Sequence, residues 1–130
     1  MSKAYDFLIE CGVFFLSTTH ENSPAVRPFG AVMELDGVLY VSTANTKEVY
    51  SQLISNERIQ IVALKPGTRD WIRINARAIE THDLEEKQAM LDACPVLLKR
   101  FGTKECAYFA LFKMTDMEAV LITNDGVIQL

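Results

Sequence analysis

Residues 34–41, ELDGVLYV, carry the clearest fold signal in the chain. Asp36 and Gly37 separate two short apolar runs, and both residue types tolerate the positive φ angles of a two-residue type I′ turn. The stretch therefore predicts two antiparallel strands that meet at Gly37. Direct strand-to-strand connections of this kind argue against a doubly wound parallel sheet, in which helices separate the strands.

Further strands are expected on both sides of this hairpin. Each is a short apolar or alternating run bounded by turn-forming residues. These runs are residues 13–18, 25–35, 59–64, 71–81, 107–114, 118–123 and 127–130. Many short strands with few helices between them predict a mainly antiparallel barrel or sandwich.

Two or three helices accompany the strands. Apolar residues at helical spacing before Gly12 predict a short helix that ends at this glycine. A second helix is expected to begin near Thr46, with Asn45 and Glu48 spaced as a capping box. A third covers residues 83–93 and is interrupted by the proline that follows. The pattern predicts one mainly β (α+β) domain, residues 1–130, with helices over the openings of the barrel.

Composition limits what kind of protein this is. The chain has 130 residues, of which 49% are hydrophobic and 23% charged, as in a soluble globular domain. Its net charge of −4 disfavours nucleic-acid binding, which needs a basic field. No apolar run approaches about 18 residues, so neither a membrane span nor a signal peptide is expected. Three cysteines without a C-x-x-C pair predict a cytoplasmic protein with free thiols.

Residues 71–78, WIRINARA, form the most informative single strand. Alternation places four apolar residues on one face and Trp71, Arg73, Asn75 and Arg77 on the other. Two cations, an amide and the only tryptophan suit contact with an anion, a planar ring or a second polypeptide. A solvated strand face, with the arginines paired to carboxylates, explains the pattern equally well.

A second candidate is the predicted strand-to-helix junction at residues 41–47. It brings Ser42 and Thr43 to the start of a helix that carries Lys47 in its first turn. Unpaired N–H groups and the helix dipole favour an anion at such a junction. Alternatively, these side chains only cap the helix and Lys47 faces solvent.

A third candidate is residues 26–30, VRPFG. Arg27 precedes Pro28, Phe29 and Gly30, and this order removes a backbone donor and side-chain bulk where a flat molecule could lie. The alternative is an edge strand with a bulge. A simple hairpin arrangement places this segment beside residues 40–43, so the second and third candidates would form one site.

Other chemistries have little support in the sequence. His20 and His82 stand alone, so no metal site is expected. No G-x-S-x-G motif is present, and Cys94 and Cys106 are interpreted as packed small hydrophobic residues. No catalytic residue and no metal ligand is therefore assigned.

With these segments in this order, the chain resembles the pyridoxamine 5′-phosphate oxidase-like, FMN-binding split-barrel family, in particular its short bacterial members. The resemblance covers nearly the whole chain and rests on the leading helix, the Asp36-Gly37 hairpin and the three candidate segments. It implies an antiparallel split β-barrel of six to seven strands with two to three flanking helices. It also implies a homodimer with flavin bound at the interface.

The resemblance further implies which residues bind FMN. Arg27 and Lys47, with a hydroxyl of the 41–47 junction, would hold the phosphate or ribityl chain, because a phosphate dianion needs charged hydrogen bonds. The backbone of residues 28–30 would line the isoalloxazine, and the 71–78 strand would approach from the other subunit. The expected cofactor-binding residues are Arg27, Pro28, Phe29, Gly30, Ser42, Thr43, Lys47, Trp71, Arg73 and Asn75.

For function, the resemblance implies an FMN-dependent oxidoreductase that passes electrons from a small-molecule donor, such as a nicotinamide nucleotide, to a small acceptor. The alternative is a non-catalytic protein that stores or senses flavin or haem. The name-giving oxidases recognise their substrate with a C-terminal extension, whereas this sequence ends at Leu130. Oxidation of pyridoxamine phosphate is therefore not expected, and the family fold does not choose the substrate.

Overall fold

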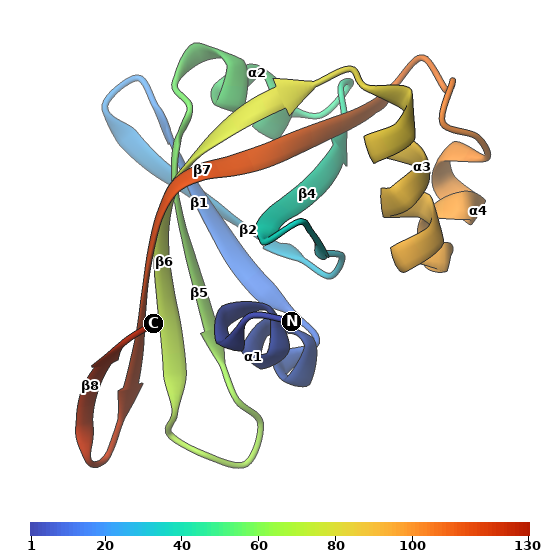
Figure 1. Ribbon diagram of the computed structural model, residues 1–130. Helices are drawn as coiled ribbons and strands as arrows, with labels where there is room; N and C mark the ends of the chain where they lie inside the picture. The colour runs from blue at the N-terminus through green and yellow to red at the C-terminus, as the bar shows by residue number, and fades with distance from the viewer.

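An antiparallel sheet of eight strands coils into a split barrel with helices around it in the computed structural model, which describes residues 1–130 (Figure 1). The strands are β1 (Phe14–His20), β2 (Ser23–Phe29), β3 (Met33–Leu35), β4 (Val38–Ala44), β5 (Arg58–Leu64), β6 (Trp71–Thr81), β7 (Phe109–Thr123) and β8 (Gly126–Gln129). The helices are α1 (Lys3–Cys11), α2 (Glu48–Ser55), α3 (Leu84–Ala93), the 3₁₀ helix η1 (Pro95–Leu97) and α4 (Leu98–Phe101). The predicted fold class is confirmed.

The strand order is β2-β1-β5-β6-β7-β4-β3, and β8 also pairs with β7. The long strands β6 and β7 lie side by side across the molecule (Figure 1). On its other edge, β7 pairs with β4 along Phe109–Lys113 and with β8 along Val120–Thr123. The two ends of β7 therefore belong to different parts of the barrel.

The number of elements differs from the sequence prediction of six to seven strands and two to three helices. Residues 25–35 form two strands, because the chain leaves the β1 edge after Phe29 and pairs again as β3. The runs expected at 107–114 and 118–123 form one strand, Phe109–Thr123, because Asp116, at a φ of 50°, absorbs an irregularity in the β6–β7 register without ending the pairing. From Pro95 onward, the chain forms two short helices, η1 and α4.

The predicted hairpin turn before β4 and the predicted capping box of α2 had different outcomes. Asp36 and Gly37 have φ angles of 51° and 79°, so the predicted hairpin between β3 and β4 is confirmed. The predicted capping box is wrong: α2 begins at Glu48, and its N-cap Lys47 makes no side-chain capping bond. The Asn45 side chain instead donates to the carbonyl oxygen of Ala107, 3.0 Å away, because the loop before β7 lies against this junction.

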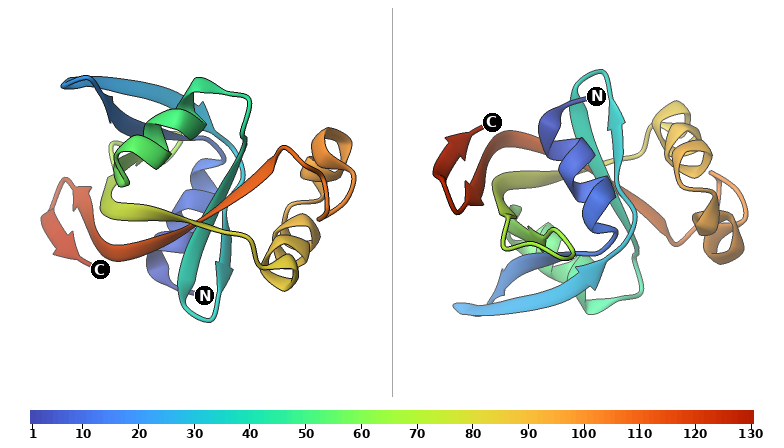
Figure 2. Two further views of the ribbon diagram at one scale, coloured as in Figure 1. Left: turned by 90° about the horizontal axis from the view of Figure 1, so that it is seen from above. Right: turned by 90° about the horizontal axis from the view of Figure 1, so that it is seen from below.

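Two hydrophobic clusters hold the fold together. The first fills the barrel with the inward side chains of its strands and is covered by α1 and α2. The second lies outside the barrel, where α3, η1 and α4 pack against β3, β4 and the start of β7 (Figure 2). Strand β4 separates the two, with Leu39 and Val41 in the barrel core and Tyr40 in the outer cluster.

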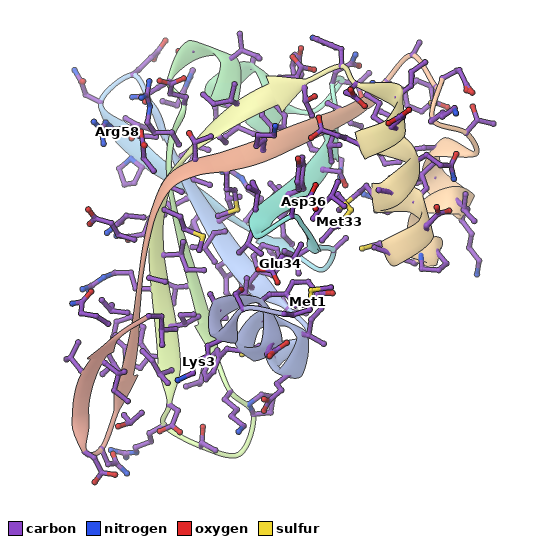
Figure 3. The ribbon with its side chains drawn as sticks, viewed as in Figure 1. Met1, Lys3, Met33, Glu34, Asp36 and Arg58 are labelled. Atoms are coloured by element: carbon purple, nitrogen blue, oxygen red, sulfur yellow. The ribbon has the colours of Figure 1, made fainter.

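Helix α1 is attached to the β3–β4 hairpin by a polar contact. The backbone N–H of Ser2 donates to the Glu34 carboxylate at 2.7 Å, and the Ser2 hydroxyl accepts from the N–H of Tyr5. Figure 3 shows Glu34 directed toward the start of this helix. The Ser2 side chain thus caps α1, the helix that packs against the barrel core.

None of the helices is long and apolar enough to cross a membrane.

The barrel core gives a stability prediction. Ile74 on β6 is fully buried, whereas Ile79 on the same strand is 37% exposed. We expect Ile74→Ala to lower the free energy of unfolding by about 2–5 kcal/mol and Ile79→Ala by clearly less, because only the first leaves a cavity in the core. Urea denaturation measures both losses, and equal losses would contradict this assignment of the core.

Candidate functional site

A pocket of about 430 Å³ opens where the end of β2, strand β4, the start of α2 and the η1–α4 segment meet. Seven of the ten residues expected to bind a cofactor line it: Arg27, Pro28, Phe29, Gly30, Ser42, Thr43 and Lys47. The other lining residues are Ala31, Val49, Val96, Leu97 and Arg100. The second and third candidate segments of the sequence therefore do contribute to one cavity.

Their convergence does not come from the expected pairing. Strand β2 pairs with β1, and β4 pairs with β3 and β7, so residues 27–30 and 40–43 are not strand partners. The expected hairpin register is wrong because residues 30–32 carry the chain from one sheet edge to another before β3 begins. At Gly30, an added Cβ would meet only the Gly12 carbonyl oxygen at 4.0 Å, so the space beside this backbone is open.

Arg27 is half-buried and strongly hydrogen-bonded. Its Nη1 donates to the Thr18 hydroxyl at 2.9 Å and to the Leu16 carbonyl oxygen at 3.2 Å, and its Nη2 donates to Gln52 Oε1 at 2.6 Å. Burial lowers the pKa of the guanidinium, while the nearby Glu48 carboxylate opposes this shift. An arginine nevertheless remains protonated at neutral pH, so Arg27 places a fixed positive charge at the pocket wall.

Lys47, the N-cap residue, brings a second cation to the start of α2. It is exposed and forms no ion pair, and the first N–H groups of the helix after it have no intrahelical partner. Arg100 of α4 adds a third cation, and no Asp or Glu lines the pocket. A chain with a net charge of −4 thus has a cavity whose charged lining residues are all positive, and such a cavity is suited to an anion.

Sequence reasoning missed the wall formed by Val96, Leu97 and Arg100. The second hydrophobic cluster positions this wall, because Leu97 and Phe101 are buried against β4 and β7. The basic pair Lys99-Arg100, next to a predicted helix, was the available signal. Nothing local showed that it would face the β2–α2 region.

A polar network attaches α3 to the sheet. The Glu86 carboxylate accepts hydrogen bonds from the hydroxyl groups of Tyr40 and Thr81, and Lys113 Nζ lies 3.4 Å from it. The Tyr40 hydrogen bond is the main reason that the pKa of Glu86 falls below its usual value, and burial raises that of Tyr40. The network fixes α3 to the sheet. Helices η1 and α4, which line the pocket, follow α3 in the chain.

The other three expected residues, Trp71, Arg73 and Asn75, do not line this pocket. They lie on the outer face of β6, where the Arg73 guanidinium is 5.8 Å from the centre of the Trp71 ring. Asn75 accepts a hydrogen bond from Gln60 at 2.8 Å and lines a separate polar cavity of about 470 Å³. Arg58, on the β5 wall of that cavity, is labelled in Figure 3.

An apolar band crosses this outer face. Trp71 lies opposite Leu64 of β5 and Ile122 of β7, and Ile122 lies opposite Val127 of β8. Leu64 is 58% exposed and Val127 64% exposed. Four neighbouring strands thus present large apolar side chains to the outside, an arrangement typical of protein interfaces.

These features define a split β-barrel with a pocket lined by cationic side chains. The family model described as pyridoxamine 5′-phosphate oxidase matches residues 1–115, and the chain belongs to this family. It is 34% identical to a NimC/NimA family protein from Clostridium acetobutylicum, with a TM-score of 0.90 over 98% of this chain and 91% of that one. No curated protein matches the sequence.

Two more distant structures share the fold. A haem-binding protein from Mycobacterium smegmatis is 15% identical, with a TM-score of 0.78 over 95% of this chain and 54% of that one. An FMN-binding, pyridoxamine 5′-phosphate oxidase-related protein from Nostoc punctiforme is 16% identical, with a TM-score of 0.62 over 92% of this chain and 78% of that one.

The Glu86 network gives a prediction about acid stability. Because the folded state lowers the pKa of Glu86, its contribution is complete above the unfolded pKa and is lost as the pH falls through the folded one. Glu86→Gln should therefore lower the free energy of unfolding by about 1 kcal/mol at pH 7. Between about pH 5 and pH 3, the free energy of unfolding should fall less in this variant than in the wild type. Urea denaturation at these pH values, with Glu85→Gln as the exposed control, measures this; parallel losses in wild type and Glu86→Gln would contradict it.

Proposed function

We propose that the protein binds FMN in the pocket between β2, β4 and α2 and is a flavin-dependent oxidoreductase that acts on a small acceptor. The observation that carries this proposal is the meeting of Arg27, Lys47 and the open backbone at Gly30 in a cavity without acidic residues. The volume is within the range of small-molecule sites, roughly 300–1,000 Å³. The FMN-binding relative from Nostoc punctiforme supports the choice of cofactor.

The pocket residues fit the parts of FMN. Arg27 and Lys47 would hold the phosphate dianion, and the hydroxyl groups of Ser42 and Thr43 would meet the ribityl chain. The backbone of residues 28–30 would lie along the isoalloxazine. Bound flavin supplies the redox chemistry, so the chain needs only to orient the ring, set the charge near it and leave one face open. No residue is therefore assigned a catalytic role.

We also propose that a second copy of the chain covers the apolar band through Trp71 and completes the site. A band that includes the exposed Leu64 and Val127 and the partly exposed Ile122 is costly in water and suits a self-complementary interface. In such a homodimer, Trp71, Arg73 and Asn75 would reach the partner's flavin. This role explains a polar and aromatic strand face that lines no part of the pocket in its own chain.

A non-catalytic flavin-binding or flavin-sensing protein is the second candidate, and turnover separates it from the enzyme. Saturable oxidation of NADH or NADPH in the presence of an acceptor would support the oxidoreductase. Haem is the weaker ligand, although one relative binds it, because no His, Cys, Met or Tyr lines the pocket. The three free thiols fit the expected cytoplasmic location.

The cofactor proposal predicts that the purified protein, after addition of FMN and gel filtration, keeps flavin absorbance bands near about 375 and 450 nm. Arg27→Ala and Lys47→Ala should each raise the FMN dissociation constant about 10- to 100-fold, because a charged hydrogen bond contributes about 1.5–3 kcal/mol. Lys99→Ala on the exposed side of α4 is the control. Flavin-fluorescence titration gives the constants, and wild-type affinity in both pocket variants would refute this site.

The dimer proposal predicts a sedimentation mass of twice the 14.6 kDa chain. Trp71→Asp should shift the protein toward monomer and weaken FMN binding at least about tenfold, because a buried unpaired carboxylate costs several kcal/mol at an interface. Leu84→Asp, at an exposed leucine of α3, tests whether any added charge has this effect. A wild-type protein that stays monomeric in sedimentation would exclude the shared site.

A further inference from the structure

Two buried polar side chains, which do not line the pocket themselves, hold Arg27 at the pocket wall. Thr18 of β1 is 1% exposed and Gln52 of α2 is 6% exposed, and neither lines the pocket. The Thr18 hydroxyl donates to Gln52 Oε1 at 2.6 Å, so these residues form a closed triangle with the guanidinium. Polar groups this deeply buried are normally fully paired, and here their partner is the cation of the candidate site.

The triangle leaves one edge of the guanidinium unused. Gln52 Oε1 accepts from Nη2 and Thr18 Oγ1 accepts from Nη1, and these two oxygen atoms are 2.6 Å apart. They therefore lie at the end of the guanidinium, where Nη1 and Nη2 are neighbours. The other Nη1 hydrogen is taken by the Leu16 carbonyl oxygen. Nε–H and the second Nη2 hydrogen are left, and they can bind one oxyanion through two parallel hydrogen bonds.

The triangle also connects the two cations. Gln52 lies on α2, one turn beyond the end that carries Lys47, and Thr18 lies on β1, which pairs with β2. A helix that moved relative to β2 would break the Gln52–Arg27 hydrogen bond. The relative position of Arg27 and Lys47 is thus set by a buried contact outside the pocket.

We propose that Thr18 and Gln52 are positioning residues that turn the free edge of Arg27 toward the phosphate of the bound cofactor. Gln52 supplies a neutral acceptor, which holds the guanidinium without cancelling its charge. A carboxylate at this position would make an ion pair and compete with the anion. The inference rests on the proposed function, because it concerns the phosphate end of the FMN site.

The decisive variant is Gln52→Glu, which keeps the shape of the side chain and adds one negative charge beside Nη2. We expect it to raise the dissociation constant of FMN at least about tenfold and that of riboflavin, which has no phosphate, less than about threefold. Gln52→Met removes the acceptor without a charge and should weaken FMN binding several-fold, with the same preference for the phosphate-bearing ligand. Gln88→Glu on α3 is the control for charge.

Fluorescence titration with FMN and riboflavin, alongside a thermal melt of each variant, distinguishes the outcomes. Two outcomes would overturn the positioning role alone. In the first, the Gln52 variants lose affinity for FMN and riboflavin equally. In the second, both Gln52 variants keep wild-type FMN affinity while Arg27→Ala binds FMN weakly. If Gln52→Glu does not fold, Gln52→Met decides between the same outcomes. Wild-type FMN affinity in both Arg27→Ala and Lys47→Ala overturns the FMN site itself, and the positioning role with it.

Discussion

The candidate site depends on one strand that is buried on both faces. Leu39 and Val41 of β4 belong to the barrel core, while Tyr40 belongs to the cluster under α3 and α4. Without the outer cluster, β4 would be an ordinary barrel strand with one solvated face. The packing of Leu97 and Phe101 brings η1 and α4 over that face, and a pocket remains where these helices meet the ends of β2 and α2.

Electrostatics then determines what the pocket can hold. A half-buried guanidinium is costly unless its hydrogen bonds are satisfied, and Arg27 meets this requirement with neutral acceptors instead of a carboxylate. Its charge therefore remains available to a ligand. Arg77 shows the opposite arrangement, because it forms ion pairs with Glu57 and Asp116 on the far side of the sheet. Two arginines of similar exposure thus serve different purposes, one paired within the chain and one open to an anion.

The outer face of β6 contributes no residue to the pocket of its own chain. Trp71, Arg73 and Asn75 contact one another or neighbouring strands, but they face away from the pocket. The apolar band beside them is continuous over four strands and ends in β8, which projects from the barrel (Figure 1). An exposed apolar band of this kind on a sheet face would promote association, and a specific, symmetric partner is the ordinary way to cover it.

Local patterns in the sequence determined most of the fold class. Alternation along residues 71–78, the Asp36-Gly37 turn and the helix stop at Gly12 depend on neighbouring residues only, and the structure has all three. Strand limits were less predictable: residues 107–114 and 118–123 were expected to be separate strands, but the pairing of β7 with β6 continues between them through a bulge at Asp116. The capping box failed for a related reason, because a distant carbonyl group, that of Ala107, took the Asn45 side chain.

The sequence by itself determined which residues have suitable chemistry: a cation, Arg27, just before Pro28 and Gly30, hydroxyl groups at a strand end, and Lys47 at a helix start. Only the tertiary structure decided which of them share a cavity. Arg27 and Lys47 line one cavity because the Arg27 side chain reaches from β2 to α2, where it hydrogen-bonds to Gln52; Arg100 joins them through packing far along the chain, and Trp71 is excluded. Side-chain chemistry and short-range periodicity are local properties, whereas a pocket is made by long-range packing that no single segment encodes.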